Sequence, residues 1–227
     1  MKYTVNTVID TLKNKGYAVY ENDSKPFNLN LVGVRNSDRI SNKFNDILCA
    51  FYKYHGQWIY REYDITTDPG IIYRIKPIND KGTAIIFPGQ YNGMWQLGLH
   101  KGKYPALIQK KPCTVIRDNN KDSILDVTVP NYATIRKSTG LGYIQNDYLD
   151  DNGNVVFTTQ TGMFGINCHK SGVGNTIDVN YYSAGCVVFA DNVKFEDEFL
   201  DICNGASNSF GNSFTFTLIS DVDIVLN

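Results

Sequence analysis

The sequence lacks the features that mark several large classes of protein. Among its 227 residues, no apolar run approaches the roughly 20 residues that a membrane-spanning helix needs. The formal net charge is −1, so no excess of positive charge is present to bind a phosphate backbone, and we expect no nucleic-acid partner. Charged side chains interrupt the first 20 residues too early for a signal peptide, which predicts synthesis in the cytoplasm without an export signal.

Cysteine and histidine are scarce and are not spaced as metal ligands. The chain has 5 cysteines and 3 histidines, with no Cys-x-x-Cys pair, so we expect no structural zinc site. An odd number of scattered cysteines in a chain of this length argues against a disulfide scaffold and leaves at least one thiol unpaired in the monomer. Neither Gly-x-Ser-x-Gly nor Gly-Lys-Ser/Thr occurs, so a serine-hydrolase elbow and a phosphate-binding loop have no support.

The residues that are present favour a mainly β chain with a few helices, of the α+β class. Aromatic residues make up 13% of the chain and alternate with frequent turn formers. A helix is predicted over 4–16, capped by Thr4 and ended by Gly16. A second helix, begun by Asp191 or Asn192 and ended at 204–205, buries Cys203. A short helix is expected over 41–51, and strands are expected over 16–21, 31–35, 57–63, 83–87, 94–100, 113–117, 124–129, 155–157 and 214–220.

A turn signal at 68–70 suggests a division of the chain into two parts. The range 1–75 reads as a small α+β module, and nothing in its sequence names a function. The range 76–227 reads as the larger domain, built mostly of short strands. No internal repeat or low-complexity linker separates the two parts.

The residues with the clearest chemical potential lie in the stretch 161–191, which reads as strand, loop, strand and helix. Alternation in the first strand places Cys168 on the core face as an inert thiol and His169 on the opposite face. The second strand opens with Cys186. If the two strands pair antiparallel, opposed Cβ atoms lie about 4.5–5.5 Å apart, which lets the imidazole reach the thiol. The connection over 170–185 is long enough to serve as a binding loop.

Such a pairing would activate the thiol. An imidazolium beside Cys186 would lower the thiol pKa and raise its thiolate fraction at neutral pH. Gly185 permits a sharp turn and a close approach of substrate. The backbone N–H groups over Ala184, Gly185 and Cys186 are candidates to stabilise an oxyanion. The alternative for Cys186 is a buried structural cysteine, and the alternative for His169 is a hydrogen-bonded histidine at a strand end.

This stretch resembles the catalytic segment of the L,D-transpeptidases, the family with the YkuD-type fold. The resemblance rests on a histidine after an apolar strand, a loop, the run Ser-Ala-Gly-Cys that begins at Ser183, and then a strand and a capped helix. It covers about 155–220 closely and 80–155 loosely, and it leaves the first 75 residues unexplained. It implies that 76–227 form an L,D-transpeptidase-like β-sandwich with one helix after the catalytic strand.

The resemblance also implies roles for individual residues. Cys186 would be the nucleophile, His169 its base, and the backbone carbonyl of Lys170 would orient the imidazole. Two positions depart from the family pattern, because Ala184 stands where the family has histidine and Val188 where it has arginine. Tyr182 and Asn167 are candidates to line a substrate groove, although an aromatic residue is more often part of a core. His100 is expected on the surface, and no chemistry is assigned to His55.

Taken together, these features predict a cysteine-dependent acyl transfer or hydrolysis on peptidoglycan stem peptides, of the transpeptidase, carboxypeptidase or endopeptidase type. No metal or organic cofactor is implied. Papain-like and NlpC/P60-type peptidases are disfavoured because their cysteine precedes their histidine. The Ser-Ala-Gly-Cys variant, the missing export signal and the Asn- and Tyr-rich composition suggest a bacteriophage-encoded or similarly divergent member that acts at the cell wall. A bacteriophage-encoded member would act as a lysis or virion protein. The alternative is a virion or wall-binding structural protein with a weak or inactive site.

Overall fold

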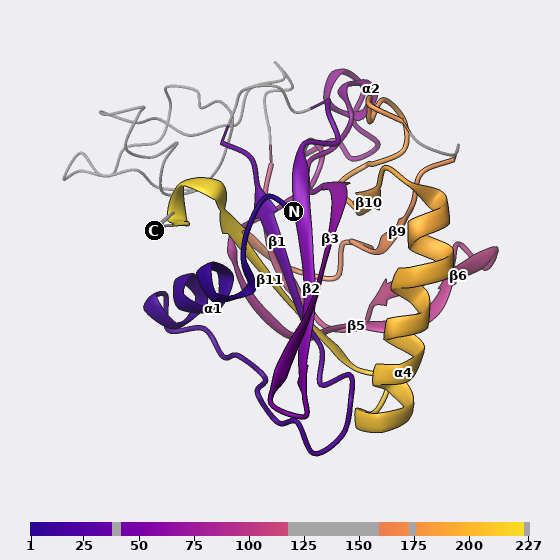
Figure 1. The fold of residues 1–227 in the computed structure, drawn as a ribbon. Coiled ribbons are helices and arrows are strands. Elements are labelled where there is room, and N and C mark those ends of the chain that lie inside the picture. The colour runs from indigo at the N-terminus through magenta and orange to yellow at the C-terminus, as the bar shows by residue number, and fades with distance from the viewer. Residues whose placement is uncertain (38–41, 118–158, 173–175, 225–227) are drawn as a thin grey trace.

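The computed structural model describes residues 1–37, 42–117, 159–172 and 176–224, and it confirms a mainly β chain with a few helices (Figure 1). The strands predicted over 124–129 and 155–157 lie outside the described residues. The strand predicted over 214–220 is confirmed at its bounds, and those predicted over 31–35, 57–63, 94–100 and 113–117 are confirmed with shifted ends. Among the described residues, none of the helices has the length and apolar character to span a membrane.

A closed barrel, and not the sandwich that the family resemblance implies, forms the centre of the fold. Its strands follow the order β1-β11-β5-β6-β9-β10-β3-β2. The pairs β1–β11 and β9–β10 are parallel, and the other pairs are antiparallel. The barrel strands are β1 (Asn30–Arg35), β2 (Asp46–Tyr54), β3 (Gln57–Thr66), β5 (Gly89–His100), β6 (Tyr104–Gln109), β9 (Cys168–Lys170), β10 (Val187–Phe189) and β11 (Phe214–Ser220).

A smaller three-stranded sheet and the helices complete the described fold. The sheet has the order β4-β7-β8, with β4 at Ile85–Ile86, β7 at Cys113–Ile116 and β8 at Gln160–Gly162. The helices are α1 (Val5–Asn14), α2 (Ile71–Ile75), a π-helical segment (Lys194–Phe199) that runs directly into α4 (Leu200–Phe210), and a short 3-10 turn (Asp221–Asp223).

The boundary predicted between residues 75 and 76 falls inside the sequence that builds the barrel. Strands β1, β2 and β3 come from the first range, whereas β5, β6, β9, β10 and β11 come from the second. Hydrogen bonding joins the two ranges twice, because β1 pairs with β11 and β3 pairs with β10. The two predicted parts therefore share one barrel and the core inside it.

Helix α1 forms as its sequence predicts. The Thr4 hydroxyl accepts a hydrogen bond from the Thr7 N–H at 3.1 Å, and Gly16 takes a left-handed conformation at φ 72° just after the helix. The apolar stripe packs on the outer face of β1, β2 and β11, through buried contacts of Val8, Ile9 and Leu12. This packing explains why β2 is apolar on both faces, since one face lines the barrel interior and the other lies under α1.

Three predicted elements are wrong, each for a physical reason. The range 41–51 is mostly strand β2, because an apolar run buried on both faces has no period that separates strand from helix. The range 16–21 pairs with no strand; side-chain amides of Gln90 and Asn30 bind the backbone of Ala18 and Tyr20 instead. The late helix continues past 204–205 to Phe210, followed by a glycine at φ 93°.

Gly205 is a packing residue and not a helix end. A Cβ atom built there would lie 2.7 Å from the ring of Phe27, so the glycine lets that ring contact the helix backbone. Cys203 on the same helix is fully buried among apolar side chains, which confirms its assignment to the core.

Candidate functional site

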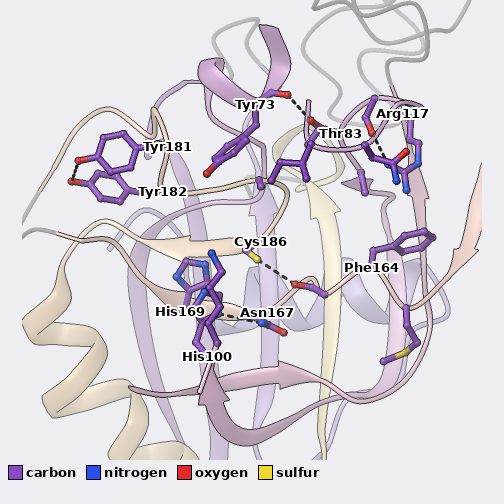
Figure 2. Close-up of a pocket in the computed structure, with 18 residues that line it drawn as sticks. Tyr73, Thr83, His100, Arg117, Phe164, Asn167, His169, Tyr181, Tyr182 and Cys186 are labelled. Carbon is purple, nitrogen blue, oxygen red and sulfur yellow. Dashed lines mark hydrogen bonds between the residues drawn. The ribbon is translucent and has the colours of Figure 1, made fainter. Parts of the chain in front are cut away.

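An open cavity of about 550 Å³ brings together most of the residues that the sequence singled out (Figure 2). It lies where the ends of barrel strands β5, β9 and β10 meet the residues flanking the small sheet. Five predicted site residues line it. They are Asn167, His169, Tyr182, Ala184 and Cys186.

Strands β9 and β10 pair parallel, so the predicted antiparallel pairing is wrong. Val188 is opposite His169 in this register, and the Val187 N–H donates to the Asn167 carbonyl at 2.9 Å. Cys186 comes two residues before Val188 and so lies on the same sheet face as His169, one step along the strand. Both side chains line the cavity, whereas the adjacent residues Cys168 and Val187 are buried in the core.

The strand predicted over 161–169 is broken into two parts. In the segment between the two parts, the Gln109 side chain takes the place of a neighbouring strand. Its oxygen accepts hydrogen bonds from the N–H groups of Phe164 and Ile166, each at 3.0 Å. Gly165 lies in this irregular segment at φ 72°, and its carbonyl oxygen faces the cavity. The Cys186 thiol donates to that carbonyl, with the sulfur 3.4 Å from the oxygen (Figure 2).

Cys186 differs from the other four cysteines in its access to solvent. It is half-buried at the cavity wall, whereas Cys49, Cys113, Cys168 and Cys203 are fully buried. The inert role predicted for Cys168 agrees with this, because burial raises the pKa of that thiol well above its usual value. Burial also raises the pKa of the Cys186 thiol, and a backbone hydrogen bond at Asn167 and the charge of Lys101 offset part of this effect.

His169 is held in one orientation by the backbone carbonyl of Lys170. Its Nδ1 lies 2.8 Å from that oxygen, and because a carbonyl only accepts, Nδ1 carries the proton. The unprotonated Nε2 then remains as a proton acceptor. The Tyr104 hydroxyl lies 3.2 Å from the same Nδ1. The Lys170 side chain points elsewhere and forms an ion pair with Glu196 at 2.6 Å.

The protonation states of Cys186 and His169 differ from the thiolate and imidazolium that the sequence predicts. Burial, which has the largest effect, together with the neighbouring His100 and Lys101 lowers the pKa of His169 to about 3, and the hydrogen bond with the Lys170 carbonyl opposes this shift. With the thiol pKa raised, both groups are neutral at pH 7. The arrangement can therefore act by general-base transfer of the thiol proton during attack, rather than from a preformed ion pair.

His100 is a part of the site that the sequence placed wrongly on the surface. Only 6% of its surface is exposed, and its ring centre lies 4.0 Å from that of His169. Its Nδ1 is 3.2 Å from the side-chain nitrogen of Asn167, whose oxygen accepts from the Gln109 N–H at 2.8 Å. No local signal could have shown this, because the contact needs β5 and β9 to meet at one barrel end.

The turn before Cys186 is braced by Ser183. The buried Ser183 hydroxyl donates to the Cys186 carbonyl at 2.7 Å and accepts from the Gly185 N–H at 3.1 Å. The Gly185 N–H is therefore engaged and is not a free oxyanion donor in this conformation. Ala184 is exposed at the cavity, so the position where the L,D-transpeptidases have histidine carries no proton-transfer group here.

The loop that leads to Cys186 is anchored by residues of the range 1–75, for which the sequence suggested no role. The Asn42 side-chain oxygen accepts from the Asn180 N–H at 2.8 Å, and the Val179 N–H donates to the Asn42 carbonyl at 3.0 Å. The Gly70 N–H donates to the Ser183 carbonyl at 2.9 Å. Lys43 also forms an ion pair with Asp178. These contacts hold the turn before Cys186 against the barrel.

Tyr182 lines the cavity as predicted, next to Tyr181. The two ring centres are 4.6 Å apart, and the Tyr181 hydroxyl lies 3.3 Å from that of Tyr182 (Figure 2). Opposite them, the cavity is lined by residues that the sequence did not suggest, among them Tyr73, Lys101, Arg117 and Phe164. These come from four separate segments, so only the folded chain assembles them.

We expect that replacing His100 with glutamine raises the pKa of His169. Glutamine stays neutral and keeps an acceptor for Asn167, so it removes the repulsion between the rings while preserving burial. The His169 pKa should rise but stay below 6.5, because burial remains the larger effect. Titration of the imidazole proton resonances by NMR measures this. An unchanged titration midpoint, or an ordinary value near 6.5 in the parent, would contradict the assignment.

Within the described residues, no group of three or more histidine, cysteine, aspartate or glutamate side chains is placed to hold a metal ion. The polar groups that line the cavity include a thiol, two imidazoles and two cationic side chains. Comparison with known protein families, with curated proteins and with solved structures finds no match to this chain.

Proposed function

We propose that this chain is a cysteine-dependent acyl-transfer enzyme that acts on the peptide stems of peptidoglycan at the bacterial cell wall. The observation that carries the proposal is the placement of Cys186 and His169 on one sheet face at the wall of one cavity, with the Lys170 carbonyl fixing the imidazole tautomer. The link to peptidoglycan comes from the resemblance of this segment to the L,D-transpeptidases. A bacteriophage lysis or virion protein would use such an activity.

The proposed reaction has two steps. The Cys186 sulfur attacks an amide carbonyl of the stem peptide while Nε2 of His169 accepts the thiol proton. The carbon–nitrogen bond then breaks, and the imidazolium returns that proton to the leaving amine, which gives a thioester. In the second step, water or an amine attacks the thioester, its proton passes to His169 and on to the sulfur, and the thiol is restored.

The test is turnover of purified stem peptides. The protein is incubated with disaccharide tetrapeptides, with and without an added amine acceptor, and products are identified by mass spectrometry. Loss of the terminal amino acid indicates hydrolysis, and a new amide to the acceptor indicates transpeptidation. Blocking Cys186 with iodoacetamide, confirmed by peptide mapping, should stop either reaction. Absence of both products with correctly folded protein would refute the proposal.

A wall-binding protein with a weakly reactive thiol is the second candidate. Two features of the site favour it. The raised thiol pKa and the engaged Gly185 N–H both reduce reactivity. This candidate predicts that the protein sediments with purified cell walls, that the Cys186→Ala variant sediments equally, and that no stem peptide is cleaved. Thiol-dependent cleavage would exclude it.

A further inference from the structure

The cavity carries two positive side chains from separate segments. Lys101 comes from the turn between β5 and β6, and Arg117 directly follows β7. Among the described residues that line the cavity, none is an aspartate or a glutamate. The lining is otherwise aromatic, apolar or neutral polar, so the described wall has a net positive charge. A cavity of this sign and size suits a small ligand that bears a negative group.

Arg117 is buried, and none of its neighbours in the described part of the chain carries a negative charge. Only 7% of its surface is exposed. Its Nε donates to the Gln160 side-chain oxygen at 2.9 Å, and Nη1 donates to the Gly82 carbonyl at 2.5 Å. Its guanidinium carbon lies 5.4 Å from the ring centre of Phe164. All three neighbours are neutral, and burial lowers the pKa of Arg117.

A second buried arginine among the described residues, Arg35, has a carboxylate beside its guanidinium group. Arg35 is fully buried, and its Nε lies 3.4 Å from a carboxylate oxygen of Asp68. Arg117 forms no ion pair with any described residue. A buried cation without a counter-charge is costly, and such a cost is tolerated where a ligand supplies the missing charge.

We propose that Arg117 binds a carboxylate of the substrate peptide, with Lys101 as the second positive group of the same cavity. This inference rests on the proposed function, and it narrows the substrate to an acidic peptide. The planar guanidinium already uses Nε and Nη1, so Nη2 is the group that donates to the carboxylate. Phe164 supports the guanidinium from below and leaves one edge toward the cavity (Figure 2).

The position of Lys101 ties this anion site to the catalytic pair. Lys101 directly follows His100 in the chain and lines the same cavity as His169 and Cys186. Arg117 lies on the opposite side of the cavity, beside Phe164 (Figure 2). A peptide whose carboxylate rests on Arg117 would therefore extend across the cavity toward the sulfur, which orients the amide that is attacked.

The experiment measures binding by calorimetry with the full chain carrying Cys186→Ala, so that no turnover interferes. Two probes are compared, a stem tetrapeptide with free carboxylates and the same peptide with all carboxylates converted to carboxamides. We expect the acidic peptide to bind at least about tenfold more tightly. With Arg117→Gln added, this preference should fall to below about twofold, and Arg117→Lys should restore part of it.

Two exposed lysines of the same turn provide a matched control that does not disturb the fold. Lys101 lines the cavity and Lys103 does not. Lys101→Gln should weaken binding of the acidic peptide by about threefold, whereas Lys103→Gln should leave it unchanged. Near-UV circular dichroism confirms that Arg117→Gln retains its tertiary packing. If Arg117→Gln does not fold, the comparison of Lys101→Gln with Lys103→Gln tests whether positive charge at the cavity is needed to bind the acidic peptide.

The outcomes separate this inference from the proposed function. Equal binding of the two probes, or a preference that survives Arg117→Gln in a folded protein, overturns the anion site even if the enzyme cleaves stem peptides. An Arg117-dependent preference for the acidic peptide supports the anion site even if no cleavage occurs, and it then assigns the cavity to binding alone.

Discussion

Replacement of Cys186 with alanine is expected to lower kcat/KM for stem-peptide turnover by at least about three orders of magnitude, because the nucleophile is removed and the remaining contacts supply only binding. No other thiol can take its place, since the other four cysteines are buried in the hydrophobic core. The free energy of unfolding should change by less than about 1 kcal/mol, because the Cys186 side chain is half-buried at a cavity wall. Turnover is followed by mass spectrometry and unfolding by urea denaturation.

Cys203→Ala is the matched control. That thiol is fully buried on α4, away from the cavity, and contacts apolar side chains. Its removal should leave turnover unchanged while lowering the free energy of unfolding by about 1–2 kcal/mol through a small cavity. Cys186→Ala should therefore lose turnover and keep its stability, whereas Cys203→Ala should keep turnover and lose stability. Turnover that persists in Cys186→Ala, with the sample shown to be free of parent protein, would reject the thioester mechanism.

The parts of the fold that the sequence predicts well are those fixed by local interactions. Helix α1 has its cap at Thr4, its apolar stripe and its stop at Gly16 all within 13 consecutive residues. Strand β11 was predicted at its observed bounds because alternating Phe and Thr residues mark it. Strand β2 was taken for a helix, because burial on both faces erases the alternation.

Barrel closure and the parallel pairing of β9 with β10 could not be predicted, because both depend on which distant strands become neighbours. The same limit applies to the site. Cys186 and His169 are found from the sequence because they bracket one loop in a recognisable order. His100, Lys101 and Arg117 come from other segments with no motif around them. The barrel end brings His100 and Lys101 to the cavity, and the small sheet brings Arg117.

A substitution of Gly185 with alanine is expected to reduce turnover by at least about a hundredfold while the barrel stays folded. The sequence suggested that this glycine allows substrate to approach. In the structure it allows a main-chain oxygen to approach, because a Cβ at this position would lie 2.2 Å from the carbonyl oxygen of Ala84. Gly185 also has φ 113°, a backbone conformation that residues with a side chain rarely adopt. The turn must shift to accept a methyl group.

That shift moves the proposed nucleophile, because Cys186 is the next residue. The Ser183 hydroxyl donates to the Cys186 carbonyl and accepts from the Gly185 N–H, so the three residues move together. A displacement of about 1 Å in a reacting group is enough to cost about a hundredfold in rate. Gly16→Ala is the control, because it introduces the strain of a positive φ without a steric clash. Gly16 has φ 72°, and no atom lies within 4 Å of its Cβ position. That variant should lose about 1 kcal/mol of unfolding free energy and no turnover. Equal turnover in the Gly185→Ala variant and the parent would show that the turn before Cys186 does not position the thiol for attack.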